Sequence, residues 1–377
     1  MPAVTITSRA IERITSGHLW IYRSDVSEAS AAEPGAVVRL FDRKKHYWGQ
    51  GLYSSASQIA VRLLTREERP FDEAFLAERI RAAAAFREQV APGVQARRLV
   101  GAEGDLLPSL IIDRYGDCFV IQTLSQGMDR LKPAIVEILR KEFAPLSIIE
   151  RNDVAVRALE GLPGQAGVLA GEEISEVVIE ENGRKFCIDL RRGQKTGAFL
   201  DQRENRAAAA GYARGRALDC FTYTGGFALT LAPHCASVLG VEASADALAL
   251  AGRNQKLNGF TNLEWKEANC FDFLKAADQA KERFDTVVLD PPAFARQKPS
   301  LESALRGYKE LNLRALKILN PGGYLVTCSC SYHVSEADFL DVIAGAALDA
   351  RRPSPSSSAA RSRAITPSCS PFRKRII

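Results

Sequence analysis

The sequence predicts an α/β fold whose largest part is an open, parallel β-sheet with helices on both faces. In the second half of the chain, short apolar segments alternate with segments of helical periodicity, which is the pattern of a parallel sheet. Most of these apolar segments end in polar or glycine-rich motifs, at the end where open α/β sheets bind ligands. Residues 1–68 instead contain closely spaced short strands and glycine turns, which favour a small β-barrel.

The chain of 377 residues is long enough for two or three domains. We expect a barrel over 1–68, an α/β linker domain over 70–189, a catalytic domain over 190–350 and a tail over 351–377. No apolar run reaches membrane-spanning length, and the first residues do not read as a signal peptide, so we expect a cytoplasmic protein without a membrane partner. The eight cysteines lack paired ligand spacing, which favours reduced thiols over disulfides or a metal site.

The N-terminal segment contains four apolar strands and one short helix. The strands are expected at 4–6, 37–41, 47–53 and 59–64, and the helix places Ile11 and Ile14 on one face. The net charge of +5 permits a nucleic-acid partner without requiring one. Eight basic side chains could contact phosphates, although for any single one an exposed charge is the better explanation: Arg9, Arg13, Arg23, Arg39, Arg43, Lys44, Lys45 and Arg62.

The middle segment shows little visible chemistry. We expect helices at 71–90 and 129–143, and a strand pair at 110–113 and 118–122. Asn182-Gly183 is a strong hairpin signal. We interpret this segment as a scaffold that orients the N-terminal module against the catalytic domain.

A dense polar run precedes the first strand of the catalytic domain. Residues 191–206 carry charged and amide side chains on both sides of a short apolar centre. An exposed loop would explain the charges, but the position just before a ligand-binding strand favours a role in holding cofactor or substrate. Lys195, Gln202 and Arg203 are the candidates.

The strand that follows ends in the motif around which the catalytic domain is organised. An apolar strand reaches Asp219, a turn with Gly225-Gly226 follows, and the next strand ends in Glu242 about 20 residues later. This offset is typical of a nucleotide-binding turn, in which the glycines let the backbone approach the ligand and the carboxylate accepts from both ribose hydroxyls. The alternative is an ordinary strand-to-helix turn. We expect a nucleoside ligand.

The remaining elements alternate in the same way. Helices are expected at 245–258, 306–319 and 336–348, and strands at 263–265, 284–289 and 324–330. A Pro321-Gly322-Gly323 turn is expected to separate the helix at 306–319 from the last strand.

Several motifs at successive strand ends together resemble class I S-adenosylmethionine-dependent methyltransferases. They are Asp219, Thr224-Gly225-Gly226, Glu242, Asn269, Asp290-Pro291-Pro292 and Gly322-Gly323. Three further features narrow the resemblance: the run from Gln194 to Arg203, Phe294 two residues after the proline pair, and Ser329-Cys330-Ser331. With the N-terminal segment, which resembles a PUA domain, the chain is similar to bacterial 23S ribosomal RNA cytosine-5 methyltransferases from residue 1 to about 350.

This resemblance implies S-adenosylmethionine as cofactor, 23S rRNA as partner and a Rossmann-like sheet. The implied cofactor residues are Asp219, Phe221, Thr222, Thr224, Gly225, Glu242, Asn269, Cys270, Phe271 and Asp290. The turn at Gly225 would approach the methionine part, Asn269 with the Cys270 backbone would read the adenine, and Phe271 could pack on it. The implied substrate contacts are Lys195, Gln202, Arg203, Pro291, Pro292 and Phe294.

The resemblance also implies that Cys330 is the nucleophile and that Asp290 faces the target base. Carbon 5 of cytosine is a poor nucleophile, so a thiolate must first add to carbon 6, and a carboxylate near ring N3 assists. The target cytosine must be in single-stranded RNA or flipped out of its stack. In a strand at 324–330, Cys328 and Cys330 share one face. Both could be small buried hydrophobes, but Cys330 lies nearer the strand end and matches the motif.

Two other functions remain open. The same enzyme class could methylate a guanine or adenine nitrogen, which needs no thiol. Alternatively, the chain could be an RNA-binding protein without activity. The RNA could be free or part of a large-subunit precursor. A homodimer is a further hypothesis, which a monomeric mass in sedimentation would exclude.

The tail differs from the rest of the chain. From Arg351 it is rich in serine, proline and arginine without apolar periodicity, so we expect 351–377 to be disordered. Similar sheets usually finish with a helix and two strands, and no such strands are visible here. Codons for residues 362–375 can be chosen so that a shifted frame resembles the missing end. We therefore hypothesise a frameshift near codon 350, and an intact frame on resequencing would contradict it.

Overall fold

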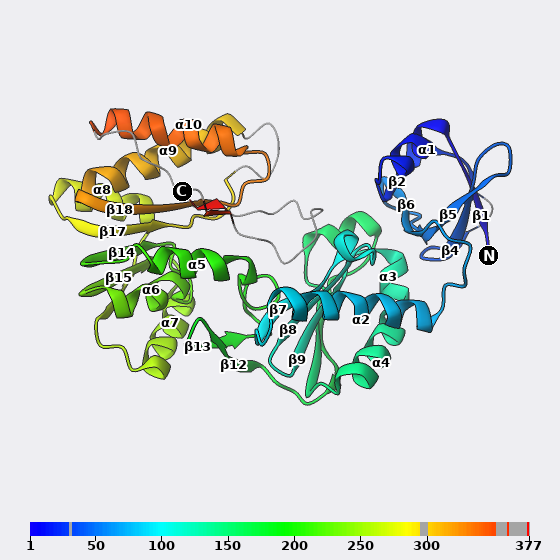
Figure 1. Ribbon diagram of the computed structural model, residues 1–377, viewed down its shortest axis with the longest axis horizontal. Coiled ribbons are helices and arrows are strands. Elements are labelled where there is room, and N and C mark those ends of the chain that lie inside the picture. The colour runs from blue at the N-terminus through cyan, green and yellow to red at the C-terminus, as the bar shows by residue number, and fades with distance from the viewer. Residues whose placement is uncertain (30–31, 295–300, 352–359, 362–374, 377) are drawn as a thin grey trace. The chain divides into compact units, whose positions relative to one another are not determined.

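The computed structural model describes residues 1–29, 32–294, 301–351, 360–361 and 375–376 (Figure 1). The chain forms two compact units. The first contains Met1–Ile179 and Ile188–Ala198, and the second contains Glu180–Cys187 and the chain from Phe199 through the last helix. The N-terminal and middle segments, which we expected as two domains, thus share one unit. No helix of the described residues is long and apolar enough to cross a bilayer.

The N-terminal part of the first unit is a six-stranded sheet around its own core. Its strand order is β2-β6-β5-β4-β1-β3. Its elements are β1 (Ala3–Ile6), α1 (Ser8–Thr15), β2 (Trp20–Tyr22), β3 (Val26–Ala29), β4 (Val37–Phe41), β5 (Tyr47–Tyr53) and β6 (Ile59–Thr65). Val4, Ile14, Leu40 and Val61 are fully buried inside it. The four expected strands and the helix are confirmed, while β2 and β3 are additional.

Three of its basic residues form ion pairs with buried carboxylates within the unit. Arg62 is 7% exposed and pairs with the buried Glu160 at 2.7 Å. Arg9 and Arg13 both pair with Asp25, which is fully buried. An unpaired buried charge is costly, so Arg62 is held inside the unit, while the side chains of Arg9 and Arg13 stay 57% and 34% exposed above the buried Asp25.

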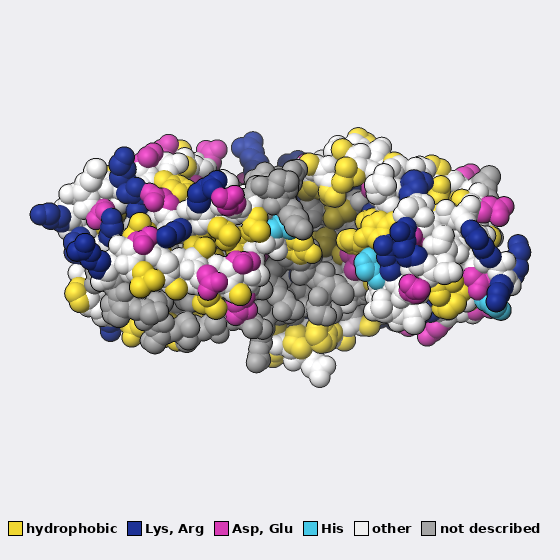
Figure 2. Space-filling view, turned by 90° about the horizontal axis from the view of Figure 1, so that it is seen from above, with side chains coloured by type: hydrophobic (Ala, Val, Ile, Leu, Met, Phe, Trp, Pro, Cys, Tyr) yellow, Lys and Arg dark blue, Asp and Glu magenta, His cyan; other side chains and the backbone are white. Residues whose placement is uncertain are grey.

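Three further cations of the set are exposed. Arg43, Lys44 and Lys45 lie in the exposed turn between β4 and β5. On the face drawn in Figure 2, Lys and Arg side chains are interspersed with Asp and Glu. Charge alone therefore does not mark a single basic track on that face.

The middle part of the first unit is a five-stranded sheet in the order β11-β10-β9-β8-β7. Its strands are β7 (Ala96–Gly101), β8 (Leu110–Tyr115), β9 (Cys118–Thr123), β10 (Ser147–Arg151) and β11 (Ala166–Gly171). Its helices are α2 (Glu73–Val90), α3 (Gln126–Arg130) and α4 (Lys132–Phe143), so the helix expected at 129–143 is in fact two helices. A hairpin follows, β12 (Glu176–Glu181) and β13 (Arg184–Asp189), as its Asn-Gly signal predicted.

The second unit contains the expected parallel sheet. The strand order is β16-β15-β14-β17-β18-β20-β19, and the pairings from β16 through β18 are all parallel. These five strands are β14 (Arg216–Cys220), β15 (Ser237–Glu242), β16 (Leu263–Glu267), β17 (Phe284–Leu289) and β18 (Leu319–Ser329).

Helices cover both faces of this sheet, as its uniformly apolar strands require. They are α5 (Arg203–Ala210), α6 (Gly226–Leu231), α7 (Ala245–Asn258), α8 (Cys270–Gln279), α9 (Leu301–Ile318) and α10 (Glu336–Asp349). Figure 1 shows α8, α9 and α10 on one side of the sheet and α6 and α7 on the other. Leu218, Val287, Leu311 and Ile318 are fully buried in the core beneath α8 and α9.

Two expectations for the C-terminal part need correction. Pro321-Gly322-Gly323 does not separate helix from strand, because β18 begins at Leu319 and the register with β17 shifts around the left-handed Gly322. The region after Arg351 also contains two short strands, β19 (Ala360–Arg361) and β20 (Arg375–Ile376). Because β20 pairs antiparallel with the last residues of β18, the edge of β18 is covered there. Residues 352–359, 362–374 and 377 lie outside the described residues.

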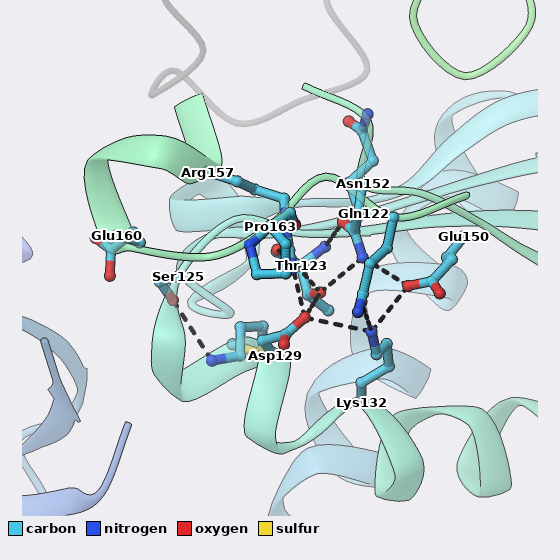
Figure 3. A network of polar contacts seen from close by, with 12 residues as sticks. Gln122, Thr123, Ser125, Asp129, Lys132, Glu150, Asn152, Arg157, Glu160 and Pro163 are labelled. Carbon is cyan, nitrogen blue, oxygen red and sulfur yellow. Dashed lines mark hydrogen bonds and ion pairs between the residues drawn. The ribbon is translucent and has the colours of Figure 1, made fainter. Parts of the chain in front are cut away.

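A buried polar network fixes the end of β9 in the first unit (Figure 3). Arg157, 1% exposed, donates to Asp129 at 2.9 Å and to the Pro163 carbonyl at 2.9 Å. The Thr123 hydroxyl donates to the same carboxylate at 2.7 Å. Burial raises the pKa of Asp129, but the bonds from Arg157 and Thr123 outweigh it and keep that pKa below its ordinary value. The end of β9 is therefore held by a network that includes buried charge.

Arg157→Ala should destabilise the protein by about 3–5 kcal/mol, because it leaves a partly buried carboxylate without its main cation. Arg130→Ala is the matched control, since Arg130 is 57% exposed and pairs with the exposed Glu33. Its loss should cost under about 1 kcal/mol. Urea unfolding of both variants measures the difference, and equal costs would contradict the account.

Candidate functional site

The candidate site lies at the carboxyl ends of β14, β17 and β18. In the sheet, β15 and β16 lie on one side of β14, and β17 and β18 lie on the other. The ends of β14 and β17 therefore flank the point where the strand order reverses, which is where open α/β sheets bind ligands.

Asp219 near the end of β14 is fully buried. Its Oδ2 accepts from the Thr222 hydroxyl at 2.6 Å and from the Ala228 backbone N–H at 2.9 Å, which ties the strand to α6. Its Oδ1 has no hydrogen-bond partner among the described residues. Burial, with smaller contributions from the charges of Asp290 and Glu242, raises the pKa of Asp219 to about 7.

The backbone after β14 adopts left-handed conformations at several positions. Phe221 has φ +62°, Tyr223 has φ +52° and Gly225 has φ +86°. Two non-glycine residues in this region indicate local strain of the kind that clusters at binding sites. A Cβ at Gly225 would lie 2.9 Å from the Trp265 ring. The glycine therefore makes room for a side chain of the protein as well as permitting the turn.

Glu242 at the end of β15 is already engaged by three backbone N–H groups. Its Oε2 accepts from Tyr223, and its Oε1 accepts from Ala243 and Ser244, at 2.8–3.1 Å. A carboxylate offers about four acceptor positions. Glu242 therefore has room for about one ribose hydroxyl, rather than the two that we expected.

Asn269 begins α8 next to this turn. Its Oδ1 caps the helix by accepting from the Phe271 N–H at 2.9 Å, while its amide nitrogen has no hydrogen-bond partner among the described residues. The Cys270 thiol is buried and accepts from the Phe221 N–H at 3.2 Å. The Phe221 and Phe271 rings meet edge-on at 6.5 Å. An exposed amide beside two rings suits a purine.

Asp290 follows β17 directly and is half-buried. Its Oδ2 accepts from Gln202 Nε2 at 2.7 Å. Gln202 therefore lies beside the expected site residue Asp290 and donates to its carboxylate. The next residue, Pro291, is buried, while Pro292 is exposed.

The two candidate nucleophiles differ in exposure. Cys328 lies inside β18 and is fully buried, whereas Cys330 lies just past the end of β18 and is half-buried. The Cys330 thiol donates to the carbonyl of Pro291 at 3.6 Å, which brings it to the residue after Asp290. Accessibility favours Cys330 over Cys328.

Tyr308, a residue that sequence reasoning missed, fixes the loop that carries Cys330. Its fully buried hydroxyl meets Ser331 Oγ at 2.9 Å and accepts from Ser329 Oγ at 3.1 Å, so it bridges the two serines that flank the cysteine. Ser331 Oγ also accepts from the Phe294 N–H at 3.1 Å. The sequence signal is one tyrosine on the apolar face of an amphipathic helix, which is usually a core residue.

The other expected residues lie around this centre or elsewhere. The Thr224 carbonyl accepts from Asn254 on α7, and Arg203 pairs with its neighbour Glu204. The Phe294 ring packs 4.8 Å from that of Tyr308. Lys195 is exposed and belongs to the first unit. No group of side chains that could hold a metal ion occurs in the described part of the chain.

Asp219 predicts a pH-dependent stability. Since its pKa rises from 3.8 to about 7 on folding, folding takes up a proton between these values. The contribution of Asp219 is therefore fully present below pH 4 and is lost as pH rises to about 7, by about 4 kcal/mol. The stability difference between the wild type and Asp219→Asn, measured by urea unfolding from pH 4 to 8, should change by this amount in disfavour of the wild type. A difference independent of pH would contradict it.

Comparisons with known proteins show the family to which the chain belongs. A family described as PUA-like domain matches residues 4–66, and the family described as S-adenosylmethionine-dependent methyltransferase matches residues 161–351. The chain is 42% identical over 345 residues to ribosomal RNA large subunit methyltransferase I of Photobacterium profundum, which covers 89% of this chain and 87% of that protein. The protein of the same name from Salmonella arizonae is 37% identical over 360 residues, 93% of this chain and 89% of its own length.

Solved structures share the fold. A putative S-adenosylmethionine-dependent methyltransferase from Streptococcus mutans superposes with a TM-score of 0.79 at 20% identity, over 100% of this chain and 99% of that one. A putative methyltransferase complexed with SAH gives 0.80 at the same identity and coverage. The N-terminal PUA-like module, the parallel sheet and S-adenosylmethionine as cofactor are thereby confirmed. The chain belongs to the S-adenosylmethionine-dependent methyltransferases with an N-terminal PUA-like domain, the family of ribosomal RNA large subunit methyltransferase I.

Proposed function

We propose that this enzyme methylates carbon 5 of a cytosine in 23S rRNA through a covalent bond between Cys330 and carbon 6 of the base. The names of the relatives support a large-subunit ribosomal RNA as substrate. Such a substrate implies that the enzyme acts in the cytoplasm. The observation that carries the proposal is the half-buried Cys330 thiol, 3.6 Å from the carbonyl of the residue that follows Asp290.

The residues at the end of β14 and β15 fit the cofactor. The unpartnered Oδ1 of Asp219 suits a cationic group such as the α-ammonium of S-adenosylmethionine. The remaining acceptor position of Glu242 suits one ribose hydroxyl, and the exposed amide of Asn269 suits an adenine nitrogen. Phe221 and Phe271 supply apolar surface for the purine.

The bound cofactor supplies an electrophilic methyl group. For cytosine to accept it, the Cys330 thiolate would add to carbon 6 while Asp290, in its protonated form, gives its proton to ring N3, which makes carbon 5 nucleophilic. Carbon 5 would then take the methyl group, which leaves S-adenosylhomocysteine. A general base would remove the proton from carbon 5, the bond between carbon 6 and sulfur would break to release the Cys330 thiolate, and ring N3 would return its proton to the Asp290 carboxylate. These reaction steps need a thiol and a carboxyl group on adjacent loops, and the loops after β17 and β18 carry Asp290 and Cys330.

Cys330→Ala should lower methyl transfer to unmodified 23S RNA by about 10³-fold or more, because the activating nucleophile is lost. Cys328→Ala is the matched control in the same strand and should retain activity, since its thiol is buried. Transfer of label from S-adenosylmethionine, with mapping of the product to 5-methylcytosine, measures both.

Other outcomes separate the alternatives. Full activity in Cys330→Ala with a methylated guanine or adenine nitrogen would replace the proposal with nitrogen methylation, which needs no thiol. RNA binding without any methyl transfer by the wild type would favour a protein that only binds RNA.

A further inference from the structure

Gln202 lies beside Asp290 although the two residues are 88 positions apart in the chain. Its side chain is 1% exposed, and its Nε2 donates to Asp290 Oδ2 at 2.7 Å. Asn205 is also 1% exposed and donates from Nδ2 to Gln202 Oε1. Three side chains therefore form a row that ends on the carboxylate at the site.

Gln202 stands at a helix N-cap but uses its side chain for this contact and not for capping the helix. Gln202 ends a short 3₁₀ turn, Leu200–Gln202, and occupies the N-cap position of α5. Serine, threonine, aspartate and asparagine are the residues that cap helices well. The Gln202 side chain makes no capping hydrogen bond. Departures from local preference of this kind are expected at functional positions.

The residues after Asp290 explain why its carboxylate needs such a partner. Aspartate side chains in loops are often held by the backbone N–H groups of the next residues. Here the next two residues are Pro291 and Pro292, which have no N–H. These two residues can give the carboxylate no backbone donor, and Gln202 supplies one from its side chain.

Asn205 determines which end of the Gln202 amide faces Asp290. The amide oxygen accepts from Asn205, so the NH₂ group points at the carboxylate. The negative charge of Asp290 contributes to raising the pKa of the buried Asp219. A donor on Asp290 offsets part of this repulsion between two carboxylates in one site.

We propose that Gln202 is a positioning residue for methyl transfer, which holds the Asp290 carboxylate toward the target base while Asn205 keeps the Gln202 amide turned the right way. The inference rests on the proposed function, because it takes Asp290 as the group that faces the base. It deepens that function by assigning a buried side chain of α5 to the orientation of the reacting ring.

A double-mutant cycle tests the role. Gln202→Leu should lower kcat for methyl transfer to 23S RNA by about 10–100-fold, and change KM for RNA and the affinity for S-adenosylhomocysteine by less than about threefold. Because Gln202 acts through Asp290, the double variant with Asp290→Asn should lose no more than Asp290→Asn alone. Losses that multiply, or a Gln202→Leu variant that no longer binds S-adenosylhomocysteine, would overturn the proposal. Should the leucine variant not fold, the isosteric Gln202→Glu takes its place with the same expectations.

Gln122→Leu is the matched control. Gln122 is another buried glutamine, whose Nε2 donates at 2.7 Å to the carbonyl of Arg151 in the first unit. It should keep kcat within about threefold of the wild type, since its amide serves the scaffold only. A loss as large as that of Gln202→Leu would show a general effect of removing a buried amide and would overturn the proposal.

A readout independent of turnover uses the side-chain amide of Gln202 in ¹⁵N-glutamine-labelled protein. Its NMR signal, identified by its absence in Gln202→Leu, should move in Asp290→Asn while that of Gln122 stays in place. An unmoved Gln202 signal would overturn the contact. Failure of the proposed function can be told apart from failure of the positioning role. If the double variant loses no more than Asp290→Asn but the product is not 5-methylcytosine, carbon 5 as the methylated atom is rejected and the positioning role stands. Multiplying losses with a 5-methylcytosine product would reject the positioning role alone.

Discussion

The site depends on the parallel pairing of β17 with β14 on one side and β18 on the other. Parallel strands end at the same edge of a sheet, so residues far apart in the chain meet there without any long loop. This pairing brings Asp219, Asp290 and Cys330 to one edge of the second unit. Asp219 lies in its strand, and Asp290 and Cys330 follow theirs directly, which fixes them more exactly than placement on a free loop would.

Hydrogen bonds then fix the loops that follow these neighbouring strands. Asp219 ties the turn after β14 to the start of α6, and Tyr308 reaches from α9 to both serines around Cys330. Ser331 in turn receives the N–H of Phe294, so the loops after β17 and β18 share one buried polar centre. Since unsatisfied buried polar groups are costly, these loops hold each other in place.

The sequence was sufficient for the features that follow from local pattern. Alternating strands and helices predicted the parallel sheet, and the polar ends of its strands predicted where Asp219 and Cys330 lie. Side-chain partners over long distances were not predictable. Tyr308 reads as a core residue of an amphipathic helix, and Gln202 shows no sign of its contact with Asp290. Arg62 reads as an exposed charge, because its buried partner is 98 residues away in the chain. The pairing of β20 with β18 was missed because two residues carry no periodicity.

Trapping of the covalent complex tests the central claim most directly. RNA in which the target base is 5-fluorocytosine should form a complex with the enzyme that survives denaturation, because fluorine at carbon 5 cannot leave as the proton does. We expect mass spectrometry of the digested complex to find the base on the peptide at Cys330. A base attached to Cys328, or methylation of ordinary cytosine by an enzyme that forms no such complex, would contradict the account.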